Sequence, residues 1–468
     1  MQGTTAPTAL TGPLQVELYS AVRRLVFLAS VEVLFGAPFM DSLWGRGPGR
    51  GAAATPYPSG SAGGGVSGSS SRGEGGGRRV RPLPLEKARA WDSSGGLAEG
   101  PLALEAAFFS FEAGFELAAS PVPHMFQPGF VQARSQLLAW LRAAHSHNLF
   151  CGTPVGELVD KSGVRDALVP NLLLALLWAS QANTAPSVFW TVARLLLPSQ
   201  AQHLKAVLQE LHEAMALRAV PGAAAALPDS TLAAAAADAS LAGCGTGEVR
   251  GAAAAQRATE RRSTASRCAA EAIRLAVQGL DVRVAAADLA LTSSTGQKVV
   301  APRGCLLAVC PFLSHQDAAL FPPSGREFDP DRGNLVLGDG TAVVPSLAGL
   351  AFGGGPYRCP GRFFAEMEVA LVAQLVLAHC PMELLPSPPA PSAAAGAGLA
   401  EAAALLVGQA VGSELALWGC GIDPSLSTGA GEAPSSEDSR LLPAPDIRRL
   451  VGVKIPARPC WVQVHSRD

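Results

Sequence analysis

The sequence predicts a mainly helical protein with small β-sheets. Apolar residues recur at helical spacing in several long stretches, whereas the strict alternation typical of strands is confined to short segments. Gly, Ser, Ala and Pro gather in three tracts between the helical stretches. Together these patterns indicate one helical domain interrupted by segments of low complexity.

Composition limits the possible functions. The chain has 468 residues, of which 48% are hydrophobic, so it can build a sizeable core. The formal net charge is −2, which argues against a nucleic-acid-binding protein. The nine cysteines form no CxxC pair, so neither a zinc site nor a disulfide framework is indicated. No signal peptide is visible, and no apolar run reaches the ~20 residues that a transmembrane helix needs.

The first part of the chain predicts helices over residues 14–36, 103–118 and 131–145. Apolar residues recur at helical spacing in the first of them. Pro121, Pro123 and Pro128 mark a turn between the second and third.

Three tracts are predicted to be insertions of low complexity, at about residues 41–100, 219–262 and 386–440. The first is dominated by Gly, Ser, Arg and Pro, and the others are rich in Ala. Such composition buries too little surface to offset the entropy of ordering. We therefore interpret residues 1–468 as one domain carrying three insertions.

An apolar helix is predicted over residues 171–184, with further helix over residues 189–216. The first begins with an all-round apolar half and ends in polar residues. Pro186 cannot donate to the carbonyl of Ala182, so it opens the helix there. The residues alone leave two interpretations open. One is a kinked core helix whose polar groups bind one another, and the other is a pocket for water or a diatomic ligand beside Thr184.

Glu271 and Arg274 lie three positions apart on a predicted helix, where they can pair. Their apolar neighbours predict that this pair is buried. Downstream, residues 281–284, 289–291 and 305–309 alternate as strands, and residues 448–463 predict a terminal hairpin.

The stretch from Phe352 to Arg362 reads Phe-Gly-Gly-Gly-Pro-Tyr-Arg-Cys-Pro-Gly-Arg and precedes an apolar helix over residues 363–377. Three glycines allow a tight turn, and we expect Pro360 at the first helical position. A cysteine just ahead of a helix N-terminus faces free N–H groups that favour its thiolate.

Phe352, Gly355, Cys359 and Gly361 match the haem-binding loop of the cytochrome P450 family, so the chain resembles that family. The resemblance implies the family's fold, with haem held between the central helix and the cysteine loop and Cys359 as the iron ligand. It also implies that Tyr357, in place of an arginine that many members carry, and Arg283 contact the haem propionates. Glu271 and Arg274 resemble the family's Glu-x-x-Arg pair, whose third partner would be Arg332.

The helix predicted over residues 171–184 ends in Trp-Ala-Ser-Gln-Ala-Asn-Thr. This stretch resembles the central helix of the sterol 7α-hydroxylases and prostacyclin synthase. Thr184 matches the threonine that steadies dioxygen and relays protons, and Asn183 stands where an acid is usual. Both are therefore candidate catalytic residues.

The function implied is monooxygenation of a hydrophobic, sterol- or lipid-like substrate with O2. Electrons would come from NADPH through a separate cytochrome P450 reductase, at the cytosolic face of the endoplasmic reticulum membrane. Two alternatives are a prostacyclin-synthase-like peroxide isomerase and a non-catalytic remnant. The N-terminal part of the family domain has no counterpart in the chain, so we expect the chain to bind haem weakly or not at all.

Overall fold

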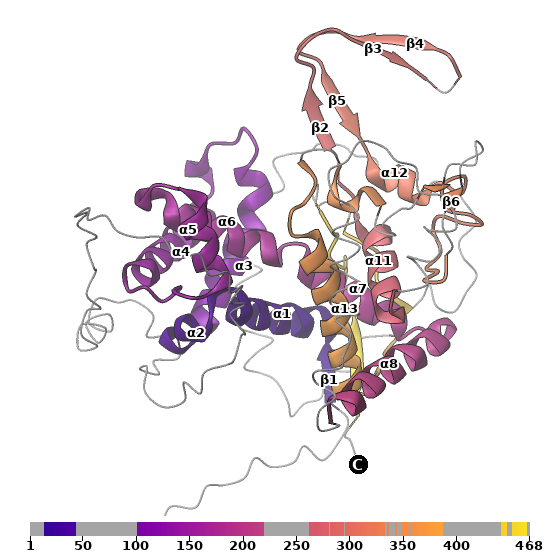
Figure 1. The fold of residues 1–468 in the computed structure, drawn as a ribbon, viewed down its shortest axis with the longest axis horizontal. Coiled ribbons are helices and arrows are strands. Elements are labelled where there is room, and N and C mark those ends of the chain that lie inside the picture. The colour runs from indigo at the N-terminus through magenta and orange to yellow at the C-terminus, as the bar shows by residue number, and fades with distance from the viewer. Residues whose placement is uncertain are drawn as a thin grey trace, which may run out of the picture. The chain divides into compact units, whose positions relative to one another are not determined.

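The computed structural model describes residues 14–43, 101–219, 262–279, 281–293, 295–332, 335–336, 342–343, 349–354, 357–386, 441–446 and 452–465. Most of the three predicted insertions lies outside these residues. The chain divides into two compact units, residues 24–181 and residues 1–23 with 182–468. Helices dominate and the sheets are small (Figure 1), so the predicted fold class is confirmed.

The unit of residues 24–181 is built from helices. Its helices, with α1 counted from its start in the other unit, are α1 (Leu18–Phe35), α2 (Ala37–Leu43), α3 (Pro101–Ala118), η2 (His124–Phe126), α4 (Pro128–Ser146), α5 (Pro154–Ser162), η3 (Asp166–Leu168) and α6 (Val169–Gln181). Pro128, predicted in the turn, is the first residue of α4, where its missing N–H is harmless.

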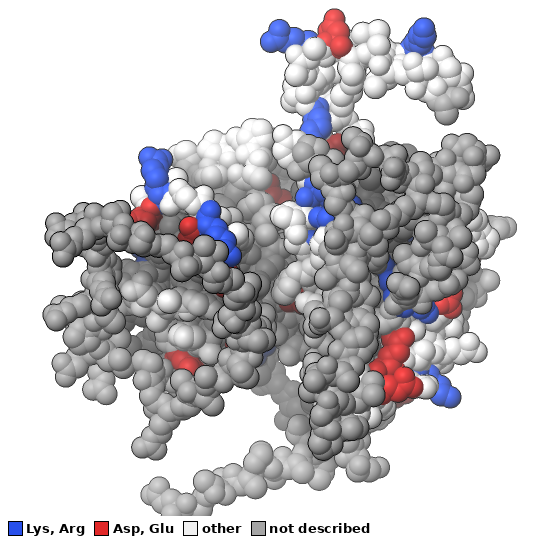
Figure 2. Space-filling model, viewed as in Figure 1, with Lys and Arg blue, Asp and Glu red and all other residues white. Residues whose placement is uncertain are grey.

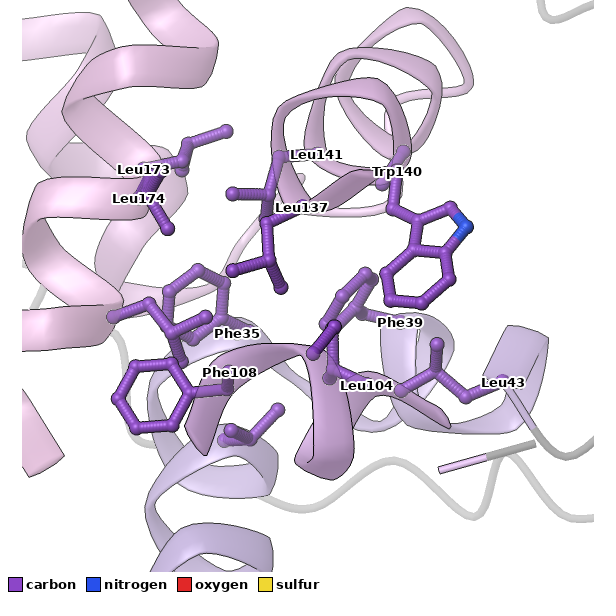
Figure 3. Close-up of a cluster of buried hydrophobic side chains, with 14 of the residues drawn as sticks. Phe35, Phe39, Leu43, Leu104, Phe108, Leu137, Trp140, Leu141, Leu173 and Leu174 are labelled. Carbon is purple, nitrogen blue, oxygen red and sulfur yellow. The ribbon is translucent and has the colours of Figure 1, made fainter. Parts of the chain in front are cut away.

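An aromatic and aliphatic core holds this unit together. α4 packs against both α3 and α6, and Figure 3 shows Leu137 and Leu141 of α4 beside Leu173 and Leu174 of α6. Phe111 of α3 stacks on Phe130 of α4 with ring centroids 5.1 Å apart. Burial of such side chains stabilises the fold by about 1.5–3 kcal/mol each.

In the other unit, α7 (Thr184–Leu195), α11 (Thr264–Ala276) and α13 (Arg362–His379) pack against one another. α8 (Ala201–Ala219) contacts all three, and η4 (Pro198–Gln200) precedes it. The predicted continuous helix over residues 189–216 is wrong, because α7 ends at Leu195 and Pro198 starts η4. Pro198 disfavours the helical conformation for the residue before it.

A three-stranded antiparallel sheet joins distant parts of the chain. Its central strand β9 (Trp461–Val464) pairs with β1 (Leu14–Glu17) and with β8 (Met382–Leu384). One prediction is therefore wrong, because residues 14–17 form a strand rather than the first turn of a helix. Part of the predicted terminal hairpin, residues 447–451, lies outside the described residues. Next to it Pro445 and Pro456 form an antiparallel bridge, whereas β9 pairs with the distant strands β1 and β8.

Two antiparallel ladders continue one another as a ribbon that projects from the helices of this unit (Figure 1). β2 (Asp281–Val284) pairs with β5 (Leu306–Val309), and β3 (Leu289–Thr292) pairs with β4 (Lys298–Ala301), a strand the sequence did not predict. Figure 2 shows the ribbon as mostly uncharged atoms with a few charged side chains. The remaining elements are α12 (Pro311–Gln316), β6 (Leu335–Val336), β7 (Ala342–Val343) and η6 (Gly349–Phe352).

Candidate functional site

Cys359 lies in the turn that leads into α13. The Cys359 N–H donates to the Phe352 carbonyl at 2.8 Å, which closes the turn over the glycines. Gly353 has a φ of +72°, a conformation that favours glycine. Cys359 is free and half-buried, and Gly355 lies outside the described residues.

The predicted helix over residues 363–377 is present as α13, but Pro360 does not begin it. Gly361 is the N-cap of α13 and Arg362 its first residue, so Pro360 precedes the cap instead of occupying the first helical position. The hydrogen bond from the Cys359 N–H to the Phe352 carbonyl closes the turn just before Pro360. The cysteine therefore stands two residues ahead of the cap.

Three arginines, Arg283, Arg358 and Arg362, lie in this turn or contact it. Arg362 donates to the Cys359 carbonyl at 3.1 Å and lies over the ring of Phe363. The Nε atoms of Arg358 and Arg362 are buried and have no hydrogen-bond partner among the residues that the structure describes. Arg283 on β2 lies over the ring of Tyr357 at 5.2 Å, so the two predicted propionate contacts come together.

These residues fit a group that carries carboxylates and a metal ion, because arginine N–H groups can bind the carboxylates and the Cys359 sulfur can coordinate the metal. Unpaired buried N–H groups of arginine suit carboxylates, because charge-assisted hydrogen bonds are stronger than neutral ones. Sequence reasoning assigned no role to Arg358 and Arg362. Their position on either side of Cys359 was the signal that could have found them.

Glu271 and Arg274 on α11 are fully buried and bound to each other. Arg274 donates to both carboxylate oxygens of Glu271, at 2.6 Å and 2.8 Å. Arg332, which is also buried, lies 3.4 Å from the same carboxylate. The structure thus brings together the three residues that the sequence suggested as a structural cluster.

The cluster also binds the backbone of the segment before Arg332. Arg274 donates to the carbonyls of His315, Gly325 and Glu327. The Asp329 N–H donates to Glu271 at 3.2 Å. Arg274 and Glu271 therefore hold the backbone of this loop through hydrogen bonds.

Other charged groups hold the same region. Asp331 accepts from His203 at 2.9 Å and from Arg267 at 3.1 Å. Burial raises the pKa of Asp331, but the hydrogen bonds and charges of His203 and Arg267 outweigh it and hold this pKa below its usual range. Arg194 lies over the rings of Trp190 and Phe328, and burial lowers its pKa to about 10.

The predicted helix opening is present. α6 ends at Gln181 and α7 begins at Thr184, with Pro186 in the first turn of α7. The Asn183 carbonyl accepts from both the N–H and the hydroxyl of Ser187. Thr184 is buried, and its hydroxyl makes no hydrogen bond with the residues that the structure describes.

The Asn183 side chain has a partner of its own. Its Oδ1 accepts from the Val453 N–H at 2.9 Å. The amide therefore binds the C-terminal segment, and its acceptor oxygen is already in use.

Two absences apply to the described part of the chain. No helix within it is long and apolar enough to cross a membrane. Within the same residues, no three His, Cys, Asp or Glu side chains are grouped to hold a metal ion.

Comparison with known proteins bears on this arrangement. Residues 271–402 match the family model described as cytochrome P450. This region contains the Glu271 cluster and the Cys359 turn.

The chain is similar to several curated sterol hydroxylases. It is 28% identical over 242 residues to the human 7-alpha-hydroxycholest-4-en-3-one 12-alpha-hydroxylase, covering 50% of this chain and 43% of that protein. Over 277 residues it is 24% identical to the Mus musculus 24-hydroxycholesterol 7-alpha-hydroxylase, with 58% and 50% covered. With the cholesterol 7-alpha-monooxygenase of Cricetulus griseus it shares 26% identity over 314 residues, with 62% and 56% covered.

A solved structure, the retinoic acid bound cyanobacterial CYP120A1, aligns with a TM-score of 0.47 and 17% identity over 81% of this chain and 65% of that one. The chain spans about half the length of the curated relatives it matches. Residues 271–402 are thus similar to the cytochrome P450 family, and the matched relatives carry the names of sterol hydroxylases.

Proposed function

We propose that the chain acts in a haem-thiolate monooxygenase that inserts one atom of O2 into a hydrophobic, sterol- or lipid-like substrate. The observation that carries the proposal is the half-buried Cys359 in a closed turn before α13, with unpaired arginine N–H groups beside it. The names of the relatives, which are sterol hydroxylases, support the substrate class.

Residues of this chain would hold the haem. Cys359 would be the iron ligand, and Arg358, Arg362, Arg283 and Tyr357 would donate to its propionates. Haem ligated by a thiolate supplies dioxygen activation, because the thiolate pushes electron density toward O–O cleavage.

Thr184 supplies a hydroxyl that can both donate and accept a hydrogen bond. It is the first residue of α7, which packs against α13, the helix that follows Cys359. Because its buried hydroxyl makes no hydrogen bond within the described part of the chain, Thr184 would be free to hold or pass on a proton beside the haem. By resemblance to the family, a separate reductase would supply electrons from NADPH. By the same resemblance, the protein would act at the cytosolic face of the endoplasmic reticulum membrane.

The test is the absorption spectrum of the reduced, carbon monoxide-treated protein. Wild type should give the thiolate-type band, and Cys359→Ser should lose it. Cys380→Ser is the matched control, because Cys380 is also half-buried and free and lies at the opposite end of α13. A thiolate-type band in Cys359→Ser would contradict the assignment of the ligand.

A further inference from the structure

Asn183 and Gly452 fit together at the break between α6 and α7. Gly452 has a φ of +78°, and a Cβ added there would lie 2.2 Å from Asn183 Oδ1 and 3.2 Å from its Cγ. No side chain fits at that distance from an amide that must stay in place. Position 452 therefore requires glycine for two reasons, its backbone conformation and the Asn183 side chain.

Asn183 is the N-cap of α7, yet its side chain does not cap that helix. An N-cap asparagine usually accepts from the second or third N–H of its own helix. Here the third residue is Pro186, which has no N–H. The Asn183 oxygen binds the Val453 N–H instead, at 2.9 Å.

The segment that Asn183 binds is fixed at several other points. The Lys454 carbonyl accepts from the Trp190 indole at 2.6 Å, and the Lys454 N–H donates to Ala276 at 3.0 Å. The Gln278 N–H donates to the Gly452 carbonyl at 3.2 Å. Residues 452–454 are thus anchored to α7 and to the C-terminal end of α11.

We propose that Asn183 is a positioning residue for Thr184. Its amide does not ionise, and its acceptor oxygen is occupied, so it is poorly suited to carry protons. Because Asn183 precedes Thr184 directly, the anchored amide fixes where α7 begins and so where the Thr184 hydroxyl lies. The anchor stands on geometry alone, whereas the role of Thr184 toward bound oxygen rests on the proposed function.

A double-mutant cycle tests the anchor without haem. The melting temperature is measured for Gly452→Ala, Asn183→Ala and the double variant. Gly452→Ala should lower it strongly in wild type, and by less than half as much when Asn183 is already Ala, because the clash is then gone. The strain from the positive φ remains in both backgrounds. If the decrease in melting temperature of the double variant equalled the sum of the decreases of the two single variants, the proposal would be overturned.

A binding measurement tests positioning in the haem-loaded protein. Imidazole is titrated and its Kd is read from the absorption shift. Asn183→Ala should change this Kd about two- to tenfold, the equivalent of one hydrogen bond. Asn183→Asp keeps an acceptor oxygen and should restore the wild-type value.

Thr153→Ala is the stability control. Thr153 caps α5 by accepting from the Gly156 N–H, so its loss should lower stability without moving α7. An imidazole Kd that Asn183→Ala leaves unchanged would show that Asn183 supports the fold only, and would overturn positioning. Failure to take up haem at all would contradict the proposed function, and the cycle would still decide on the anchor.

Discussion

Replacing Arg274 with Ala should be among the most destabilising single changes in this chain. The side chain is fully buried and holds the Glu271 carboxylate through two hydrogen bonds. Removing one partner of a buried ion pair costs about 3–5 kcal/mol, because the other charge stays buried. Arg332, at 3.4 Å from Glu271, offsets only part of that loss.

Backbone groups add to this figure. The carbonyls of His315 and Gly325 would lose Arg274 as a donor, whereas the Glu327 carbonyl keeps Arg332. An unsatisfied buried acceptor costs about 1–3 kcal/mol. Because Arg332 offsets part of the loss, we take the lower end of each range, which gives roughly 5 kcal/mol for the ion pair and the two carbonyls together, against a typical stability of about 5–15 kcal/mol.

Calorimetry of purified variants measures the effect. In a domain of 150–250 residues each kcal/mol shifts Tm by about 2–4 °C, so Arg274→Ala should melt roughly 10–20 °C below wild type. Arg274→Lys keeps the charge but loses the planar fork, and should fall between the two. It also gives a result if the alanine variant does not fold.

The matched control is Lys161→Ala, which removes an ion pair with Glu157 whose two side chains are 75% and 64% exposed. Exposed pairs contribute under about 1 kcal/mol. If the melting temperature of Arg274→Ala fell by no more than that of this control, the buried cluster of Glu271, Arg274 and Arg332 would not stabilise the fold.

Two further predictions concern titration and reactivity. Burial, followed by the charge of Arg274, lowers the pKa of His315 from 6.5 to about 4. The unfolded chain then binds a proton that the folded chain does not, so about 3 kcal/mol of stability should be lost as pH falls from 6.5 to 4. His315→Gln should flatten this dependence in urea titrations at a series of pH values, and an equal slope in the variant would refute it. Burial also raises the pKa of Cys268 and Cys460 to about 12, whereas Cys151 is exposed. Iodoacetamide at pH 8 should therefore modify Cys151 well before those two by mass spectrometry, and equal rates would contradict the burial.

Local patterns in the sequence predicted much of the candidate site. The spacing of Glu271 and Arg274 on one helix face, among apolar neighbours, correctly indicated a buried pair. Pro186 indicated the helix break, because a missing N–H is a property of the residue itself. The helical spacing of apolar residues in α3, α4 and α11 is likewise a local property of the sequence, and it predicted those helices.

What the sequence could not predict depends on partners far away in the chain. Residues 14–17 continue the apolar pattern of α1, and only the pairing with β9 makes them a strand. The amide of Asn183 matched a family position, but its bond to Val453 joins residues 270 positions apart. Pro360 was expected at the first helical position of α13, but it lies before the N-cap Gly361, next to the turn that the hydrogen bond from Cys359 to Phe352 closes.

The order of the strands in the three-stranded sheet has a consequence for biosynthesis. β1 and β8 both need β9, and the contact between Glu17 and Cys460 spans 443 positions. At about 5–20 residues per second on the ribosome, β1 waits roughly 20 to 90 seconds for that partner. During this interval its backbone N–H and C=O groups form an unpaired edge that another nascent chain can occupy. A chaperone that binds the emerging residues 14–17 should therefore raise the yield of folded protein more than one that acts on the finished chain.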